Sequence, residues 1–370
     1  MLPETPTQET KATKRSESYS RFVDGNRCRW RRLLGYYYNG RGITGPDSID
    51  LLVGKSVHKM LETVLKASPD PADPKLLASI LDGHHQAVTR MISADESLTL
   101  QADESVAMVE TLAAAWTRIT LPWVLDKFEI LAVECPEEIE VTDPEGGFVT
   151  FRSRADFIAR EKASGLISIH DFKTVSYWDD DTAELWHYNI QMYATAYSVQ
   201  QRLGTHVPHY YIHPLLKGNR RYPSPLCKPW VAPAVTPLGK PTFSLTWKKN
   251  LERDWAYKYM PVQQFIDSLP PDKMTKFVPV AGPYGTDEEM ARDFLSGAVT
   301  ENRWWYDNLD KVDWDKWADP DHHAELVRTF PRSYACWDFK KLCPYHRICF
   351  RQKGWQEPLT FGYKTRTFDK

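Results

Sequence analysis

The chain has 370 residues, of which 42% are hydrophobic and 26% are charged, a balance typical of a folded globular protein. Its formal net charge is −2, so the whole molecule does not attract polyanions, and binding to nucleic acid would need a local basic patch. No apolar run is as long as a membrane-spanning helix, and residues 1–20 lack the apolar core of a signal peptide, so we expect a cytoplasmic protein without membrane contact.

The first third of the chain is predicted to be helical. Residues 1–17 are polar and are expected to be a disordered lead. Apolar side chains then recur at helical spacing between positions 53 and 65, and Ala, Leu, Met and Glu dominate the sequence from 74 to 130. The sequence therefore predicts a helical N-terminal part over 18–130.

An arginine-rich stretch lies within this helical part. Between positions 21 and 41 there are six arginines against one acidic residue, Asp24. Such a stretch could contact phosphates, with Trp30 or Tyr36–Tyr38 stacking on unpaired bases. The alternative is a solvated amphipathic helix.

Strand patterns follow. β-Branched and aromatic residues dominate three segments separated by turn residues, which predicts an antiparallel meander over 127–142, 147–161 and 165–174. A helix over 183–204, ended by Gly204, and a strand over 206–216 come next. Helices, a meander, a helix and a further strand indicate an α/β fold with a mixed central sheet flanked by helices.

The sequence shows no internal repeat and no clear linker, so we expect a single domain over 18–354. Its parts would be the helical N-terminal part, a core over 131–216, an insertion with helices over 217–330, and a cysteine cluster over 331–354. A tail over 355–370 would follow.

The segment SIHDFKTVSY, residues 168–177, places Asp171 and Lys173 two positions apart on a predicted strand. If residues 162–165 form a four-residue hairpin loop, counting along both strands sets Asp156 opposite Asp171, with Cβ atoms ~5 Å apart. Lys173 returns to the same face because side chains alternate along a strand. The pattern thus gathers two carboxylates and an ammonium group on one face.

Two carboxylates this close repel each other and raise one pKa unless a cation lies between them. Mg²⁺ or Mn²⁺ would relieve that repulsion, because hard divalent ions prefer carboxylate oxygens. Lys173 could then orient or deprotonate a water, or balance charge that builds on phosphorus. The alternative is an ordinary cross-strand ion pair between Asp156 and Lys173, with Asp171 merely hydrated.

Four motifs occur in a fixed order: GKSVHKMLE from 54, RSRADFI from 152, IHDFKT from 169 and IQMYATAY from 190. Together they resemble the PD-(D/E)XK nuclease superfamily, specifically its RecB-type branch, and this implies a restriction-endonuclease-like core. Two departures from the branch pattern are Ser153, which replaces a usual glycine, and Thr195, which stands where a tyrosine is expected.

The resemblance also implies roles for individual residues. His58, Asp156, Asp171 and the carbonyl of Phe172 would bind the metal ion. Lys173 would be the catalytic lysine, and Gln191 would contact DNA or orient that lysine. For His58, the alternative is a buried histidine of an apolar helix face.

Three cysteines fall close together, Cys336, Cys343 and Cys349, with the spacing C-x6-C-x5-C. Clustered thiols in a chain without a secretion signal indicate metal or redox chemistry. A subset of the resembling nucleases, including AddB and CRISPR-associated relatives, holds a 4Fe–4S cluster with one further cysteine upstream, where Cys28 lies here. Two alternatives remain: free thiols, or zinc bound by the three clustered cysteines and His346.

The resemblance implies a Mg²⁺- or Mn²⁺-dependent deoxyribonuclease, expected to act as an exonuclease on DNA ends or single strands. Its process would be recombination, repair, or phage- or CRISPR-related DNA processing. Since the chain has no helicase motifs, unwinding would require a helicase or recombination partner. A catalytically silent DNA-binding subunit, or an interaction module stabilised by a metal or cluster, is the alternative.

Overall fold

The chain is represented by a computed structural model, which describes residues 15–45, 48–67, 78–79, 82–84, 86, 105, 108–109, 112–113, 115–142, 148–216, 227–228, 258–259, 278–333, 336–338 and 341–366. The chain divides into two compact units, and each is described here by itself. We call them the sheet unit, Asp47–Pro136 and Arg154–Asp287, and the cysteine unit, Met1–Pro46, Glu137–Ser153 and Glu288–Lys370.

The sheet unit is built on a mixed sheet. Its strands are β3 (Phe128–Thr142), β4 (Phe148–Glu161), β5 (Ile167–Val175), β6 (His209–Leu216) and β9 (Ala281–Gly285), of which the end of β3 and the start of β4 are assigned to the cysteine unit. β4 pairs with β3 on one side and with β5 on the other, and the order continues through β6 to β9. The β4–β5 and β6–β9 pairs are antiparallel, whereas β5 and β6 are parallel. The predicted mixed α/β architecture is therefore confirmed.

The hairpin between β4 and β5 has the predicted register. Phe157 pairs with His170 and Arg160 pairs with Ile167. The Glu161 N–H donates to the Leu166 carbonyl at 2.8 Å, which closes the loop. The loop ends at Gly165, whose φ of +74° is a conformation that glycine adopts without strain.

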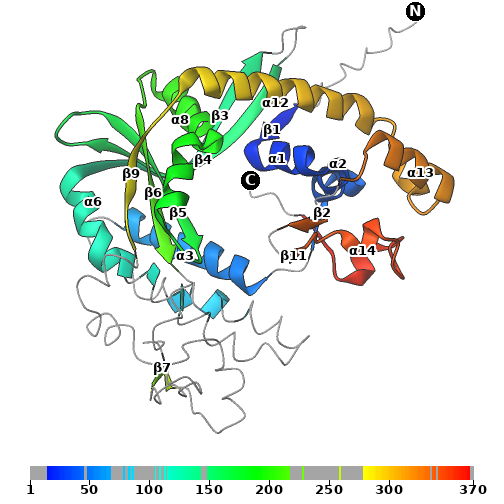
Figure 1. Cartoon of the computed structure of the whole chain (residues 1–370), viewed down its shortest axis with the longest axis horizontal. Coiled ribbons are helices and arrows are strands. Elements are labelled where there is room, and N and C mark those ends of the chain that lie inside the picture. Colours follow the sequence, from blue (N-terminus) through cyan, green and yellow to red (C-terminus); the bar gives the residue numbers. More distant parts are fainter. Residues whose placement is uncertain are drawn as a thin grey trace, which may run out of the picture. The chain divides into compact units, whose positions relative to one another are not determined.

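Two helices pack against the centre of this sheet. Helix α3 (Ile49–Lys66) starts at Ser48, whose hydroxyl accepts from the Leu51 N–H at 3.2 Å, and it packs against β5 (Figure 1). Helix α8 (Ile190–Leu203) starts at Asn189, ends at Gly204 with φ +63°, and packs against β6. The core on the α3 side buries apolar side chains of α3, of the helical residues before β3 and of the strands, among them Val57, Leu61, Trp116, Phe157 and Phe172.

The cysteine unit combines segments that are far apart in the sequence. Its helices are α1 (Tyr19–Arg27), α2 (Arg29–Arg32), α12 (Glu288–Leu309), α13 (Pro320–Thr329) and α14 (His346–Cys349). Strand β1 (Ser16–Ser18) pairs in parallel with the first residues of β4, with Ser16 opposite Thr150. Strand β12 (Lys364–Thr365) pairs with β2 (Ile43–Thr44). Residues from both ends of the chain thus build one core.

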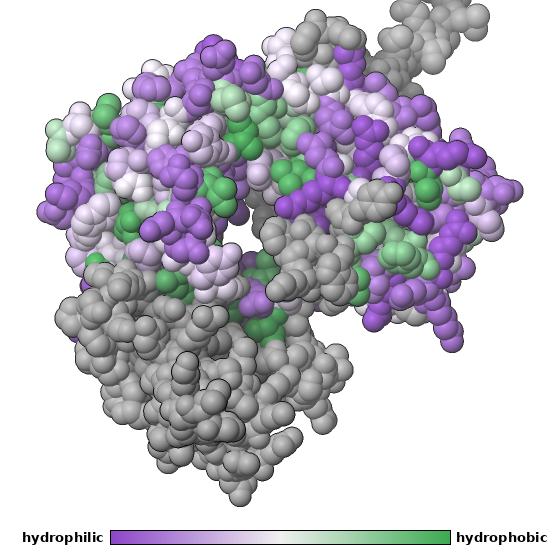
Figure 2. Space-filling view, in the orientation of Figure 1, coloured by the Kyte–Doolittle hydropathy of each residue, from purple (hydrophilic) through white to green (hydrophobic). Residues whose placement is uncertain are grey.

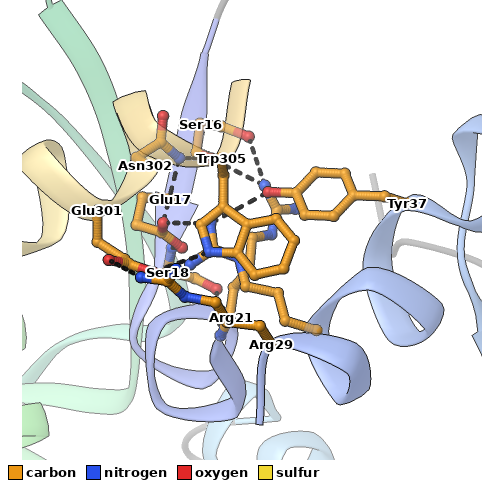
Figure 3. Close-up of polar contacts among 10 residues, drawn as sticks. Ser16, Glu17, Ser18, Arg21, Arg29, Tyr37, Glu301, Asn302 and Trp305 are labelled. Carbon is orange, nitrogen blue, oxygen red and sulfur yellow. Dashed lines mark hydrogen bonds and ion pairs between the residues drawn. The ribbon is translucent and has the colours of Figure 1, made fainter. Parts of the chain in front are cut away.

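A buried ion pair joins three of these segments (Figure 3). The Arg32 guanidinium on α2 donates to the Glu17 carboxylate on β1 at 2.7 Å, and both side chains are almost fully buried. The Asn302 amide on α12 donates to the same carboxylate at 3.1 Å, and Arg32 also donates to the Tyr37 hydroxyl at 3.1 Å. Burial lowers the pKa of Arg32, but Tyr37 and Glu17 outweigh it and raise the pKa above its ordinary value.

Several predictions on chain organisation concern residues at the limits of the described ranges or outside them. Residues 1–14 of the predicted disordered lead lie outside them, whereas Ser16–Ser18 forms β1 because Glu17 has a buried arginine to pair with. Most of 68–114 and of 217–277 also lies outside them. The predicted tail is folded over 358–366, where a 3₁₀ turn leads into β12. A single domain over 18–354 stays a prediction.

No helix among the described residues is long and apolar enough to cross a membrane. Figure 2 agrees for the face it shows, since hydrophilic residues cover much of the described surface and apolar residues occur in small groups.

Glu17→Gln is expected to lower the free energy of unfolding by about 3 kcal/mol or more, because it leaves the Arg32 charge buried without its counter-ion. Urea unfolding measures this free energy. Glu138→Gln is the control, since Glu138 pairs with Arg152 at 2.8 Å but both side chains are about half exposed. Such a pair contributes less than ~1 kcal/mol. Losses of equal size in the two variants would contradict the role given to the buried pair.

Candidate functional site

Asp156 on β4 and Asp171 on β5 lie at the centre of the candidate site. Continuing the hairpin register by one step sets the two residues opposite each other. The Asp156 carboxylate accepts the Phe172 N–H at 2.5 Å, so it reaches directly to the backbone of β5. Both aspartates are buried, at 8% and 5% exposure, which means that water solvates neither charge well.

His58 reaches the same place from α3. Its Nδ1 lies 3.4 Å from Oδ1 of Asp156. Burial lowers the pKa of His58, but the hydrogen bond and the charge of Asp156 outweigh it and raise the pKa above its ordinary value. The helix face that carries Val57 and Leu61 is buried, as the apolar pattern around His58 predicts. The imidazole of His58, however, is directed at a carboxylate.

Lys173 pairs with Asp171. Its Nζ lies 2.5 Å from Oδ2 of Asp171, so the alternative in which Asp171 is merely hydrated is wrong. Burial raises the pKa of Asp171, and the charge of Asp156 adds to this while Lys173 opposes it. The pKa of Asp156 is lowered despite its burial, because His58, Lys173 and the Phe172 N–H all favour the carboxylate. The two carboxyls therefore differ in acidity, as expected for a close pair.

Glu134 on β3 is a member of the site that the sequence pattern did not reveal. One ligand atom each of His58, Glu134 and Asp156 lies within 4.8 Å of the others. Glu134 has a φ of +51°, which is rare for a residue with a side chain, and Arg154 holds its carboxylate at 3.0 Å. Burial raises the pKa of Glu134 to about 6, and the charge of Asp156 adds to this shift. A strained residue that directs a third carboxylate inward is typical of a functional site.

Gln191 lies in the first turn of α8, where its side chain is half-buried. No contact between this side chain and Lys173 or the carboxylates is described, so its role stays a prediction. Thr195, at the departure from the family pattern, donates to the Gln191 carbonyl at 2.8 Å and is buried. Tyr193 is buried too, and its hydroxyl donates to the His187 carbonyl. No described contact joins Thr195 or Tyr193 to Asp156 or Asp171.

On the side of β5 opposite Asp171, a chain of neutral groups supports the strand. His170 alternates with Asp171 and points the opposite way, where its Nδ1 is 3.0 Å from Nε2 of His213. The Trp116 indole donates to Nδ1 of His213 at 3.3 Å. Burial lowers the pKa of His213 to about 3 and also lowers the pKa of His170, so both rings stay uncharged near neutral pH. Their role is to fill and connect the core rather than to bind an ion.

The cysteine unit brings its four predicted cluster ligands together. Strands β10 (Trp337–Asp338) and β11 (Lys341–Leu342) form a small hairpin whose register sets Cys336 opposite Cys343, and the Cys343 N–H donates to the Cys336 carbonyl at 2.8 Å. The C-x6-C spacing is therefore the length of this hairpin. Burial raises the pKa of the Cys343 and Cys349 thiols, and the thiols of Cys28 and Cys336 raise both further.

The arginine-rich stretch is structural, and its predicted stacking on bases is wrong. Trp30 is fully buried and Tyr38 is 7% exposed, and both rings pack in the core of the cysteine unit; Tyr36 is buried as well, at 7% exposure. Two of the arginines pair with acids outside the stretch, since Arg32 pairs with Glu17 and Arg29 lies 3.7 Å from Glu301. Arg31 pairs with Asp24 inside it, at 2.7 Å.

A family model described as the PD-(D/E)XK nuclease superfamily matches residues 16–350. The chain belongs to the PD-(D/E)XK nuclease superfamily. No curated protein matches it. Membership indicates a metal-dependent nuclease that hydrolyses phosphodiester bonds. The RecB-type branch, the identity of the metal and the individual residue roles remain proposals.

In this PD-(D/E)XK chain, Glu134→Gln is expected to change how stability depends on pH. The folded-state pKa of about 6 lies above the ordinary value of 4.5, so the folded protein binds the extra proton and its stability falls as pH rises through this window. The variant cannot lose this proton. Relative to wild type it should gain up to about 2 kcal/mol between pH 4 and pH 7.

Urea unfolding in EDTA at a series of pH values measures this difference. Glu129→Gln is the matched control, because Glu129 lies on the same strand but is more than half exposed and pairs with Arg160. A pH dependence of Glu134→Gln that runs parallel to that of wild type would show that Glu134 titrates normally.

Proposed function

We propose that the chain is a Mg²⁺- or Mn²⁺-dependent deoxyribonuclease of the RecB-type branch. The observation that carries this proposal is the convergence of His58, Asp156, Asp171 and Lys173 from one helix and two paired strands, in the spacing of the family motifs. Each residue of the set has one of the others within ion-pair or hydrogen-bond distance.

The donor set fits a divalent ion. His58, Glu134 and Asp156 would offer one imidazole nitrogen and two carboxylate oxygens within 4.8 Å of one another. Asp171 and the Phe172 carbonyl are the further ligands that the family motif implies. Such mixed nitrogen and oxygen donors suit a first-row divalent ion such as Mn²⁺, and carboxylates also suit Mg²⁺. When bound, the ion would supply Lewis-acid polarisation of the scissile phosphate and a more acidic water.

The protein groups then have separate tasks. Lys173 keeps its ammonium group beside Asp171, where it can orient a water or offset the negative charge that develops on the phosphate oxygens. Asp156 stays ionised at neutral pH, because its pKa is lowered, and it can accept hydrogen bonds throughout. His58 and the Phe172 N–H hold the Asp156 carboxylate in place. Gln191 would contact DNA or orient Lys173.

We further propose exonuclease action on DNA ends or single strands in recombination, repair, or phage- or CRISPR-related processing. This rests on the resemblance to the RecB-type branch, and a helicase or recombination partner would unwind duplex substrates. A catalytically silent DNA-binding subunit is the competing proposal. It predicts DNA binding without cleavage.

Lys173→Ala is expected to reduce Mn²⁺-dependent cleavage of end-labelled single- and double-stranded DNA by about 100-fold or more, because a charged group at the reacting phosphate is lost. Gel analysis of the labelled products measures the rate and the direction of cutting. Lys127→Ala is the control, since Lys127 is an exposed lysine of the same unit. Equal cleavage by Lys173→Ala and wild type would refute the assignment, and DNA binding without any cleavage would favour the silent subunit.

We propose a 4Fe–4S cluster at Cys28, Cys336, Cys343 and Cys349. Three of these four thiols are buried, and four thiolates suit iron and sulfide. The zinc alternative needs sulfur ligands about 4 Å apart around one ion. The cluster is preferred here because Cys28, a fourth cysteine, is buried in the same core as Cys343 and Cys349.

Protein purified without oxygen is expected to contain about four iron and four sulfide ions per chain. Cys349→Ser should lose both, whereas Cys135→Ser should keep them because Cys135 lies on β3, outside the proposed ligand set. Analysis of bound metal and of acid-labile sulfide distinguishes the iron–sulfur cluster from zinc. A result of about one zinc per chain and no sulfide would refute the cluster and support the zinc site.

A further inference from the structure

A chain with a net charge of −2 needs a local basic patch to bind a polyanion, and the cysteine unit contains a candidate. Between Asp338 and Glu357 the sequence has five lysines and arginines and no acidic residue. The side chains of Arg347, Arg351 and Lys353 are exposed. The positive charge of this segment is therefore local and faces the solvent.

These three cations project from one compact turn. Helix α14 leads into it, because the Phe350 N–H donates to the His346 carbonyl at 2.8 Å and the Gln352 N–H donates to the Arg347 carbonyl at 2.9 Å. The Phe350 ring between the cations is 63% exposed. We call residues 347–353 the basic turn.

The core of the cysteine unit holds the basic turn from inside. Ile348 and Cys349 are buried in that core, and Trp355 packs against it. The Arg351 guanidinium lies over the Trp355 ring, 5.7 Å from its centre. Because the backbone is fixed at these points, the exposed side chains can bind a ligand with little loss of backbone entropy.

The basic turn differs from the arginine-rich stretch in its lack of acidic partners. Within the part of the chain that the structure describes, no ion pair includes Arg347, Arg351 or Lys353. In the arginine-rich stretch, by contrast, Arg31 and Arg32 each pair with an acid at 2.7 Å. The charge of the basic turn is therefore free to attract an external anion.

An arginine from another segment adds to this charge. Arg332 follows α13, is exposed, and donates to Nε2 of the buried His323 at 3.1 Å. Burial lowers the pKa of His323 to about 4, and the charges of Arg351 and Arg332 add to the shift. Two arginines that are far apart in the sequence thus lie close to one uncharged ring, so their charges reinforce each other.

Exposed cations without acidic partners suit a ligand that carries a row of negative charges. Each lysine or arginine that contacts a DNA phosphate releases condensed counterions, and this release drives the binding. An exposed aromatic ring beside the cations can pack on an unpaired base. Arg347, Phe350, Arg351 and Lys353 provide both kinds of contact within seven positions.

We propose that the basic turn is a binding site for the phosphates of the DNA backbone. It lies in the cysteine unit, whereas the carboxylates of the candidate catalytic site lie in the sheet unit. The choice of DNA as the ligand rests on the proposed nuclease function, to which the basic turn adds a second place of contact. Arg347, Arg351 and Lys353 supply the charge, and Arg332 strengthens it.

The test is binding of a fluorescently labelled DNA duplex to the full chain purified without oxygen, followed by anisotropy in EDTA at a series of salt concentrations. The double variant Arg347→Gln with Lys353→Gln should lower the slope of log affinity against log salt by about 1.8, since each lost phosphate contact accounts for about 0.9. Phe350→Ala removes no charge, so it should keep the wild-type slope.

Lys311→Gln with Lys316→Gln is the matched control, because both lysines are exposed residues of the cysteine unit and the variant loses the same two charges. It should keep the wild-type slope, and urea unfolding checks that both double variants remain folded. A basic-turn variant with the wild-type slope would overturn the proposal. An equal fall in the two double variants would overturn it too, because overall charge would then explain the binding.

Failure here can be distinguished from failure of the proposed function, because binding in EDTA requires no metal ion. If Lys173→Ala cleaves DNA like wild type while the basic-turn variant loses salt dependence, the nuclease assignment fails and the phosphate site remains. If cleavage depends on Lys173 while the slope is unchanged, the nuclease assignment stands and the basic turn does not bind phosphates.

Discussion

The antiparallel pairing of β4 with β5 is the constraint on which the site depends. It sets Asp156 opposite Asp171 in a place where both are buried, and two such charges are stable only if the protein supplies opposite charge or hydrogen bonds. The compensating groups come from different elements: His58 from α3, and Lys173 and the Phe172 N–H from β5 itself. The site therefore exists only when helix and sheet have both formed.

The parts of this site that follow local rules could be predicted from the sequence. A four-residue loop and the alternation of side chains suffice to place Asp156, Asp171 and Lys173 on one face. Glu134 follows no such rule. Four glutamates lie within seven positions at 134–140, and a residue with positive φ decides which of them points at Asp156. Only the folded backbone makes that choice.

Long-range pairing also explains why the sequence of the arginine-rich stretch overstates how many of its arginines lack an acidic partner. Counting charges within a window assumes that the partners of an arginine are its sequence neighbours. Here Arg32 pairs with a glutamate fifteen positions earlier, and Arg29 lies beside a residue of α12.

The division of the chain has a consequence for the order in which the protein can fold during synthesis. All residues of the sheet unit precede position 288, whereas the cysteine unit needs residues 288 onward to cover its first helices. Domains begin to fold while the ribosome is still synthesising the chain. The sheet with its carboxylates can therefore form before the three later cysteines that would join Cys28 have been synthesised. Iron or zinc delivered to the emerging chain would meet a single thiol there. Loading of the proposed cysteine site would therefore be a late event, after translation has passed Cys349.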